Sequence, residues 1–298
     1  MILNNYIDGY KNYLVNVKKA SLNTVDAYLR DALQFSDFCT SVAGIKDVSL
    51  TGEKTFSEYL NHLTEIGKSE STKTRITASV RCFFKYLKSI GAVNSDPTSA
   101  IRVHKSQRKL PDVLEVNEII RLLSQPDGAD YKSRRDKAML ELHYATGIKV
   151  SELIDLKVYD VNLQVGILHT HSGSHERIIP IYRDALKHIE IYLNYARPGI
   201  VTDESEDRLF TNMNGKPLTR QGFWKIIKNY ADKANIKKDI TPQTLRHSFA
   251  THLLENGAQL KDLKDILGHS DITSTQIYAQ VLKSKYVKSY TQFHPLAK

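Results

Sequence analysis

Apolar side chains recur at helical spacing through the first hundred residues of this 298-residue chain, and no segment there alternates with a period of two. Such stripes predict amphipathic helices, one of them over residues 22–39 with Ser21 and Asn23 as candidate caps, and another that Gly91 ends. The stripes are Tyr6, Tyr10, Tyr13, Leu14 and Val17; Tyr28, Ala32, Phe35 and Cys39; Phe56, Tyr59, Leu60 and Leu63; and Ile76, Val80, Phe83, Phe84 and Leu87. The first part of the chain is therefore predicted to be a small all-helical bundle.

After the first hundred residues the spacing of the apolar residues is no longer helical throughout. The predicted elements are helices over residues 116–123 and 134–146, short β-like pieces over 154–168 and a β-branched run over 176–181. A turn-like Ser-Gly-Ser sequence at 172–174 makes a hairpin around residues 169–181 the simplest interpretation. After Asp184 the helical pattern returns and continues to the C-terminus. The whole chain is thus predicted to be mainly α, with a mixed, helix-dominated second domain that contains a small antiparallel sheet.

Charge divides the chain in a similar way. The net charge is +9, and residues 1–111 hold 16 basic and 10 acidic side chains, so the first third carries most of the excess. The basic, Pro-containing stretch RVHKSQRKLPD indicates an exposed linker. We therefore predict domains over residues 1–102 and 113–298, joined by residues 103–112. A basic protein suits a polyanionic partner, although +9 over this length also fits a well-solvated protein that binds nothing acidic.

Several classes of protein are excluded by composition. Cys39 and Cys82 are the only cysteines and lie far apart, which excludes a disulfide framework or a cysteine-based zinc site. No window approaches eighteen apolar residues, and the first twenty residues are interrupted by polar side chains. Neither a membrane span nor a secretory signal is expected, so we expect a cytoplasmic protein.

Three segments near the C-terminus hold side chains that can handle a phosphate. In the first, Thr241 and Pro242 begin a predicted helix in which Arg246 and His247 lie near the start, where free backbone N–H groups favour an anion. A second helix over 260–267 ends at Gly268 and is followed by His269, and a third, beginning near Thr273, carries Tyr278 in its second turn. Taken singly, such residues are more often core or cap residues. Their order and spacing favour a shared site.

The segments LRHSFATHLL, LGHSDITSTQIYAQV, ATGIKVSELIDL and GSHERIIPI, together with SLNTVDAYLRDALQFSDFC near the N-terminus, closely resemble the tyrosine recombinases, most nearly the bacterial Xer type. The resemblance covers almost the whole chain. It implies a SAM-like core-binding domain followed by a catalytic domain. It also implies a reaction in which a tyrosine hydroxyl attacks a DNA phosphodiester, forming a 3′-phosphotyrosine and freeing a 5′-hydroxyl. The bond energy is conserved in that link, so no cofactor, neither ATP nor a metal, is required.

The resemblance assigns roles to individual residues. Tyr278 takes the place of the nucleophile, Arg246 that of the second arginine, and His269 that of the histidine or tryptophan nine residues before the tyrosine. His247 matches a histidine that mainly supports the site. These residues would stabilise charge on the phosphate, which the reaction needs because an alkoxide is a much stronger base than a phenoxide.

Three positions depart from the family pattern. Lys149 stands where the family has arginine, and it keeps the charge but loses the planar fork that holds two phosphate oxygens. Gln243 stands where the family has histidine and cannot exchange a proton near pH 7. Ser172 stands where the hairpin turn normally carries a lysine, although His171 or His175 in the same turn can be imagined as a substitute acid. Losing one oxyanion-type donor costs on the order of a hundred- to thousandfold in rate, so the three changes together would slow or stop turnover if uncompensated.

The sequence leaves three functions to weigh. The first is a site-specific recombinase, active or slowed; the second is a DNA-binding relative that has lost cleavage and occupies sites or partners an active paralogue; the third is a helical protein that binds no nucleic acid. The family's C-terminal docking helix makes the tail, residues 283–298, a predicted oligomerisation segment, with a tetramer on double-stranded DNA. Candidate contacts to the DNA backbone are Lys73, Arg75, Arg81, Lys85, Lys105, Arg108 and Lys109.

Overall fold

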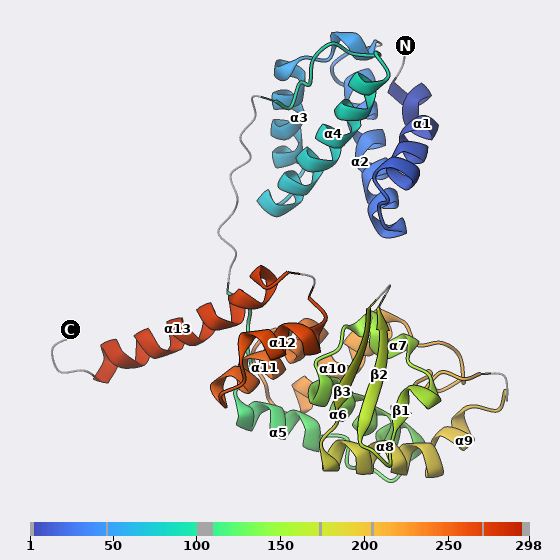
Figure 1. The fold of residues 1–298 in the computed structure, drawn as a ribbon, viewed down its shortest axis with the longest axis vertical. Helices are drawn as coiled ribbons and strands as arrows, with labels where there is room; N and C mark the ends of the chain where they lie inside the picture. The colour runs from blue at the N-terminus through green and yellow to red at the C-terminus, as the bar shows by residue number, and fades with distance from the viewer. Residues whose placement is uncertain are drawn as a thin grey trace. The chain divides into compact units, whose positions relative to one another are not determined.

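The structure is a computed structural model that describes residues 3–45, 47–99, 110–172, 175–203, 206–269 and 271–293 (Figure 1). The chain separates into two compact units, residues 1–108 and residues 109–298. Each unit has its own hydrophobic core. None of the helices in the described ranges is long and apolar enough to cross a membrane.

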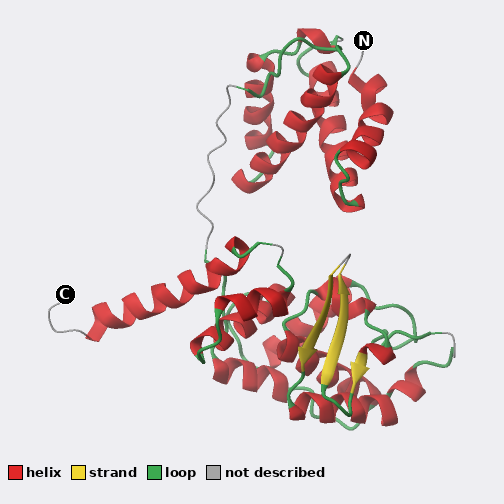
Figure 2. Cartoon of the chain, in the orientation of Figure 1, coloured by secondary structure: helices red, strands yellow, loops and turns green. Residues whose placement is uncertain are grey.

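Helices are the only regular secondary structure in the described residues of the N-terminal unit, as predicted (Figure 2). Its elements are η1 (Leu3–Tyr6), α1 (Ile7–Asn12), the π-helical η2 (Tyr13–Val17), α2 (Leu22–Ser41), η3 (Val48–Leu50), α3 (Glu53–Glu65) and α4 (Glu70–Ser89). The core is unusually aromatic: the rings of Phe35, Phe56, Tyr59 and Phe84 meet edge to face or tilted within about 6 Å. Such pairs add to the stabilisation from burial alone.

Local sequence explains where these helices begin and end. The Ser21 side chain accepts a hydrogen bond from the backbone N–H of Thr24, which confirms the predicted start of α2. Gly91, at φ +71°, follows the end of α4 as expected. The prediction that Val17 shares the buried stripe of Tyr10 and Leu14 is wrong, because Val17 is 66% exposed. The π-helical turn adds a residue to that turn and rotates the later side chains away from the core.

The C-terminal unit combines helices with one small sheet. Its elements are α5 (Val116–Ser124), α6 (Tyr131–Thr146), α7 (Val150–Asp155), η4 (Val158–Asp160), β1 (Val161–Asn162), β2 (Ile167–Ser172), β3 (His175–Pro180), α8 (Arg183–Tyr195), α9 (Arg197–Ile200), α10 (Arg220–Lys233), α11 (Pro242–Glu255), α12 (Leu260–Leu267) and α13 (Thr273–Phe293). The strands are antiparallel in the order β1-β2-β3. The predicted hairpin is confirmed, with Ile167 opposite Pro180 and Ser172 opposite His175.

Two sequence-based boundaries in this unit differ from the structure. Helix α6 begins three residues before the predicted start because the Asp130 side chain accepts from the backbone N–H of Ser133 and caps the helix earlier. The β-like pieces predicted over 154–168 are only partly strand, since Ile154 and Asp155 complete α7. Apolar residues in a short helix and in a short strand look alike at this length.

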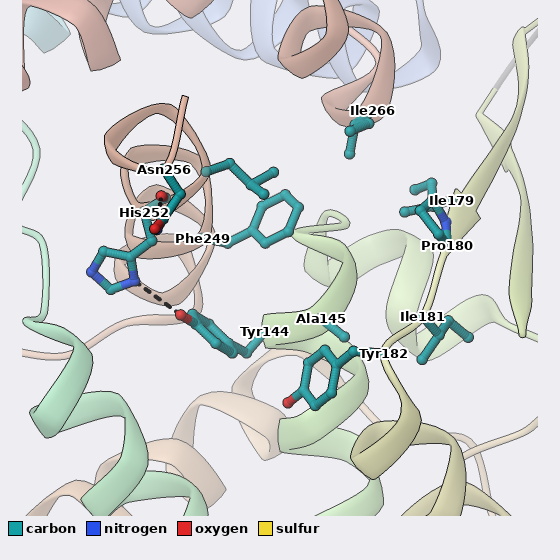
Figure 3. Close-up of a pocket in the computed structure, with 11 residues that line it drawn as sticks. Tyr144, Ala145, Ile179, Pro180, Ile181, Tyr182, Phe249, His252, Asn256 and Ile266 are labelled. Carbon is teal, nitrogen blue, oxygen red and sulfur yellow. Dashed lines mark hydrogen bonds between the residues drawn. The ribbon is translucent and has the colours of Figure 1, made fainter. Parts of the chain in front are cut away.

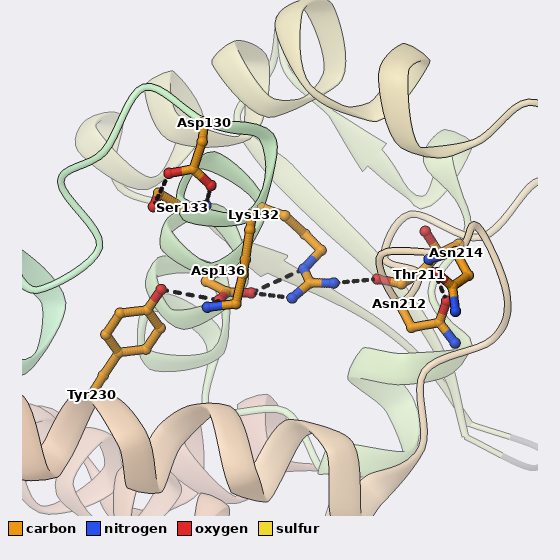
Figure 4. Close-up of polar contacts among 9 residues, drawn as sticks. Asp130, Lys132, Ser133, Asp136, Thr211, Asn212, Asn214 and Tyr230 are labelled. Atoms are coloured by element: carbon orange, nitrogen blue, oxygen red, sulfur yellow. Dashed lines mark hydrogen bonds and ion pairs between the residues drawn. The ribbon is translucent and has the colours of Figure 1, made fainter.

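A buried polar network fixes α6 against α10 (Figure 4). The Asp136 carboxylate, fully buried, accepts from the Arg135 Nε and Nη2 atoms and, at 3.0 Å, from the Tyr230 hydroxyl on α10. Arg135 also donates through Nη1 to the carbonyl of Thr211, in the loop before α10. A buried charge is tolerated only when it is paired and hydrogen-bonded, so these contacts must be kept in the folded protein. They hold α6 against α10 and against the loop before α10.

Candidate active site on helices α11 to α13

The Arg246 guanidinium lies at the centre of the candidate site. The side chain projects from the first turns of α11 and is 2% exposed. It donates to the carbonyl of Gly147 through Nη1, and through Nη2 to the carbonyl of Leu267 at 2.8 Å and to His269 Nε2 at 3.1 Å. Burial lowers its pKa. A guanidinium stays protonated under these conditions, so one fixed positive charge joins the ends of α6 and α12.

Gly147 permits this arrangement. It follows α6 in the left-handed conformation, at φ +57°, and a Cβ added there would overlap the Phe249 ring. Only glycine satisfies both conditions without strain. The turn leaves the Gly147 carbonyl pointing at Arg246, and the chain then enters α7 through Lys149.

His269 is held on both sides. It directly follows Gly268, whose left-handed conformation at φ +64° ends α12. Its Nε2 atom faces Arg246 and its Nδ1 atom lies 3.0 Å from the Thr275 hydroxyl on α13. Burial, followed by the charges of Arg246 and Lys149, lowers the pKa of His269 to about 4. The imidazole is therefore neutral at neutral pH.

Tyr278 is buried beside these groups, with 1% of its surface exposed. Its hydroxyl lies 3.0 Å from His247 Nδ1. Burial raises the pKa of the Tyr278 phenol, and the neighbouring Arg246 guanidinium opposes that rise. Burial also lowers the pKa of His247 to about 4, so this ring is neutral as well. The structure thus brings together Arg246 and His247 on α11, His269 after α12 and Tyr278 on α13.

The three departing positions lie around this cluster. Lys149 is exposed at the start of α7, close enough for its charge to act on His269. Gln243 is exposed in the first turn of α11 and lines an open cavity of about 430 Å³. Ser172 ends β2 opposite His175, but the side chains of His171, Ser172 and His175 are outside the described part of the structure.

Sequence patterns did not indicate one buried ion pair next to the cluster. Arg177 on β3 donates through Nη2 to Glu152 Oε1 at 2.6 Å and through Nη1 to the carbonyl of Ile266 at 2.9 Å. Both side chains of the pair are less than 10% exposed. A signal was present: Ile179 is an inward apolar residue of the strand, so Arg177, two residues earlier, must also face inward and needs a partner.

Residues further along α11 line an apolar cavity of about 440 Å³ (Figure 3). Phe249, the residue that packs against Gly147, forms part of its wall. The Tyr144 hydroxyl lies 2.9 Å from His252 Nδ1 at its edge. The remaining lining residues are Ala145, Ile179, Pro180, Ile181, Tyr182, Leu253, Asn256 and Ile266.

The basic residues singled out in the N-terminal unit are mostly engaged within it. Lys73 pairs with Glu70, and Arg75 pairs with the buried Asp31. The Arg81 guanidinium donates to the side chain and the carbonyl of Thr98. Lys85 is exposed and, with Lys18 and Arg81, lines a cavity of about 360 Å³. Lys105, Arg108 and Lys109 lie outside the described residues.

Comparison with known proteins identifies the relationship. Residues 112–285 match the phage integrase family, and residues 7–91 match its N-terminal SAM-like domain. The chain belongs to the phage integrase family of tyrosine recombinases. It is 43% identical over 296 residues to the tyrosine recombinase XerD of Staphylococcus epidermidis, covering 99% of this chain and 100% of the relative. Identity to XerD of Halalkalibacterium halodurans is 42%, over 99% of each chain.

Solved structures give the same fold. The XerA recombinase is 26% identical, with a TM-score of 0.55 over 98% of this chain and 99% of that one. The XerH site-specific recombinase bound to its palindromic difH substrate, in a post-cleavage complex, is 21% identical with a TM-score of 0.76, covering 92% of this chain and 81% of that one. The fold prediction, a helical domain followed by a helix-dominated domain with a small antiparallel sheet, is confirmed.

Proposed function

We propose that this protein is a site-specific DNA recombinase that cleaves and rejoins strands through a covalent link to Tyr278. One observation carries the proposal: Arg246 on α11, His269 after α12 and Tyr278 on α13 lie in one cluster, in which hydrogen bonds join Arg246 to His269 and Tyr278 to His247. A phenol beside a fixed cation and a neutral imidazole is suited to attack on a phosphodiester.

In the proposed cleavage step, the Tyr278 oxygen forms a bond to phosphorus while the bond to the 5′ oxygen breaks. The phenol proton passes to water, and water or a nearby acid supplies one proton to the departing 5′ oxygen, since an alkoxide is a poor leaving group. Arg246 stabilises negative charge on the non-bridging oxygens, with Lys149 adding a second positive charge near His269. Rejoining is the reverse, with a 5′-hydroxyl attacking the phosphotyrosine.

The resting geometry must change before this step. The Tyr278 hydroxyl is buried against His247, and three acceptors already use hydrogens of Arg246. A guanidinium carries five N–H hydrogens, so two of them remain for a phosphate, but the phosphate must also reach the buried phenol. We infer that DNA binding shifts α13 relative to α11, so that the chemical step is coupled to occupancy of the site.

The partner and setting belong to the same proposal. We propose that both the helical domain, residues 1–102, and the catalytic domain, residues 113–298, bind double-stranded DNA, in the cytoplasm. The exposed Lys85 and the linker residues Lys105, Arg108 and Lys109 are the proposed backbone contacts from the first part of the chain. The tail, residues 283–298, would join copies into a tetramer on DNA, or join this chain to a paralogue.

The test is trapping of the covalent intermediate. The intact protein is incubated with a pool of nicked duplexes that contain randomised sequence, so that a cleaved fragment diffuses away and rejoining is prevented. We expect an adduct that survives denaturation and is lost completely in Tyr278→Phe, which removes only the hydroxyl. Sequencing the trapped DNA then gives the target site.

A second arm addresses the three departing positions. In duplexes with sulfur at the 5′ bridging position the leaving thiolate needs no proton, so a defect in the acid at position 172 disappears. Cleavage of these duplexes only would assign the defect to proton delivery. Sequence-specific DNA binding without an adduct on either substrate would instead establish the alternative function, a DNA-binding relative that has lost strand cleavage.

A further inference from the structure

We propose that Thr275 is a positioning residue whose hydroxyl can bond to Nδ1 of His269 whether or not Nδ1 carries the hydrogen, so that His269 can change from accepting from Arg246 to donating to the phosphate. Only the effect of Thr275 on DNA cleavage rests on the proposed function. The arrangement of hydrogens around the imidazole follows from the contacts of the resting structure.

The contacts leave one consistent arrangement. A guanidinium has hydrogens to donate and no lone pair to accept, so the contact between Arg246 Nη2 and His269 Nε2, at 3.1 Å, requires that Nε2 accepts. A neutral imidazole that accepts at Nε2 carries its hydrogen on Nδ1. That hydrogen is then donated to Thr275 Oγ1, 3.0 Å away.

The Thr275 hydroxyl is held firmly in this role. Thr275 is fully buried, in the first turn of α13, and its backbone N–H donates to the carbonyl of Ile272 at 2.8 Å. Tyr278 lies three residues later on the same helix, so Thr275 and the nucleophile share a face. Any movement of the helix that exposes Tyr278 therefore also moves the partner of His269 Nδ1.

The resting arrangement cannot serve a bound phosphate. With its hydrogen on Nδ1, His269 presents only a lone pair at Nε2, and a lone pair facing an anionic oxygen is repulsive. A hydroxyl can both donate and accept, so Thr275 also supports the other arrangement. There, Nδ1 gives up its proton and Nε2 gains one through water, with no net change in charge. The Thr275 O–H then donates to Nδ1, and the Nε2–H donates to a non-bridging oxygen.

Two substitutions of Thr275 separate the effect of its hydroxyl group from the effect of its side-chain shape. Thr275→Val has nearly the same volume and remains β-branched but cannot hydrogen-bond to the imidazole, whereas Thr275→Ser keeps the hydroxyl. We expect adduct formation about 100-fold slower in Thr275→Val, the size of a lost oxyanion donor, and within about threefold of wild type in Thr275→Ser. DNA affinity should be unchanged in both. Equal losses in the two variants would overturn the proposal in favour of a packing role.

A second readout does not depend on cleavage. In protein labelled with ¹⁵N-histidine, with His269 assigned by loss of its signals in His269→Asn, the free wild-type protein should show Nδ1 protonated and Nε2 bare. In Thr275→Val the Nδ1–H loses its acceptor while Arg246 still favours a bare Nε2, so the preference for this arrangement should be weaker than in the wild type, and Thr275→Ser should show the wild-type pattern. A bare Nδ1 in the wild type would overturn the inference. If no DNA is cleaved at all, the proposed function fails while this assignment still stands or falls by itself.

The pH dependence of adduct formation adds a further check. The charged and titratable groups facing His269 are Arg246 and His247 on α11, Lys149 before α7 and Arg177 on β3. All four are unaltered in both variants. A change in the acid limb of the profile in Thr275→Val that is absent from Thr275→Ser therefore reports the imidazole, and superimposable profiles would contradict the proposal.

Discussion

The two sides of the candidate site are built in different ways. On the α11–α13 side, Arg246 and Tyr278 are almost completely buried, and the arginine holds the carbonyls that end α6 and α12. On the other side, Lys149 and Gln243 are exposed at the starts of α7 and α11. The buried residues are needed by the fold as well as by the proposed chemistry. Two of the three departures from the pattern that the resemblance implies, Lys149 and Gln243, therefore lie at exposed positions, and retention of Arg246 has a structural reason as well as the proposed chemical one.

The sharpest test of this contrast is removal of the central guanidinium. Arg246→Ala leaves two carbonyls and an imidazole without their donor and a cavity in the unit, so we expect both a loss of stability of about 3 kcal/mol and a loss of at least a thousandfold in adduct formation. Urea unfolding and covalent trapping measure the two effects. Arg246→Lys is the control, since it keeps the charge but cannot reach three acceptors. A variant of wild-type stability would show that the buried side is not structural.

The Arg177–Glu152 pair should matter to stability alone. Arg177→Met retains much of the side-chain volume but leaves the Glu152 carboxylate buried and unpaired, so we expect a loss of roughly 3–5 kcal/mol in the free energy of unfolding. The double variant with Glu152→Gln removes the orphaned charge and should recover part of that loss. Trp224, the only tryptophan, lies on α10 and reports unfolding of this unit by fluorescence. Equal stabilities of the single and double variants would refute this account.

Acid should lower the free energy of unfolding because the C-terminal unit holds buried, neutral histidines. Burial lowers the pKa of His143, His247 and His269 to about 4, below the value near 6.5 expected in the unfolded chain. The unfolded chain thus binds protons first, and stability is lost as the pH falls from about 6.5 towards 4. Between pH 7.5 and pH 5 the fully buried His143 contributes about 2 kcal/mol of that loss. Urea titrations at the two pH values measure it, and His143→Phe should flatten the difference.

Substitutions at the exposed positions Lys149 and Gln243 should change the rate of adduct formation and not the stability of the fold. Lys149→Arg and Gln243→His, combined with Ser172→Lys, restore the family's residues. We expect adduct formation to rise about tenfold or more, while Lys149→Arg and Gln243→His each change the free energy of unfolding by less than about 0.5 kcal/mol. An unchanged rate would mean that other groups already compensate for the departures. A marked loss of stability in either variant would erase the contrast between the two sides.

Much of the fold could be predicted from sequence because its signals are local. Ser21 before α2, Thr241 and Pro242 at the start of α11, and Gly268 after α12 are each read from a few neighbouring residues, and all are confirmed. The predicted burial of Val17 was wrong because the π-helical turn that contains it holds one extra residue, which rotates the side chain to the solvent side. The predicted strand at Ile154 was wrong because a short apolar run fits a helix and a strand equally well.

The sequence indicated which residues to propose for the candidate site but not how they are held in place. Arg246, His269 and Tyr278 follow one another in the order that the resemblance implies, and they lie close together in the structure. The carbonyls of Gly147 and Leu267, which fix the guanidinium, have no side-chain signature, because every residue carries one. The sequence also did not indicate Thr275 as a partner of His269, because threonine is common at the start of a helix, where its hydroxyl can bond to nearby backbone groups.

The way Arg246 is anchored also sets which parts of the chain can change length. Inserting one residue near the end of α6 would turn the Gly147 carbonyl by about 100° around the helix axis, away from the guanidinium, and an insertion in α12 would do the same to Leu267. Helices α6 and α12 should therefore keep a fixed number of residues up to their terminal glycines.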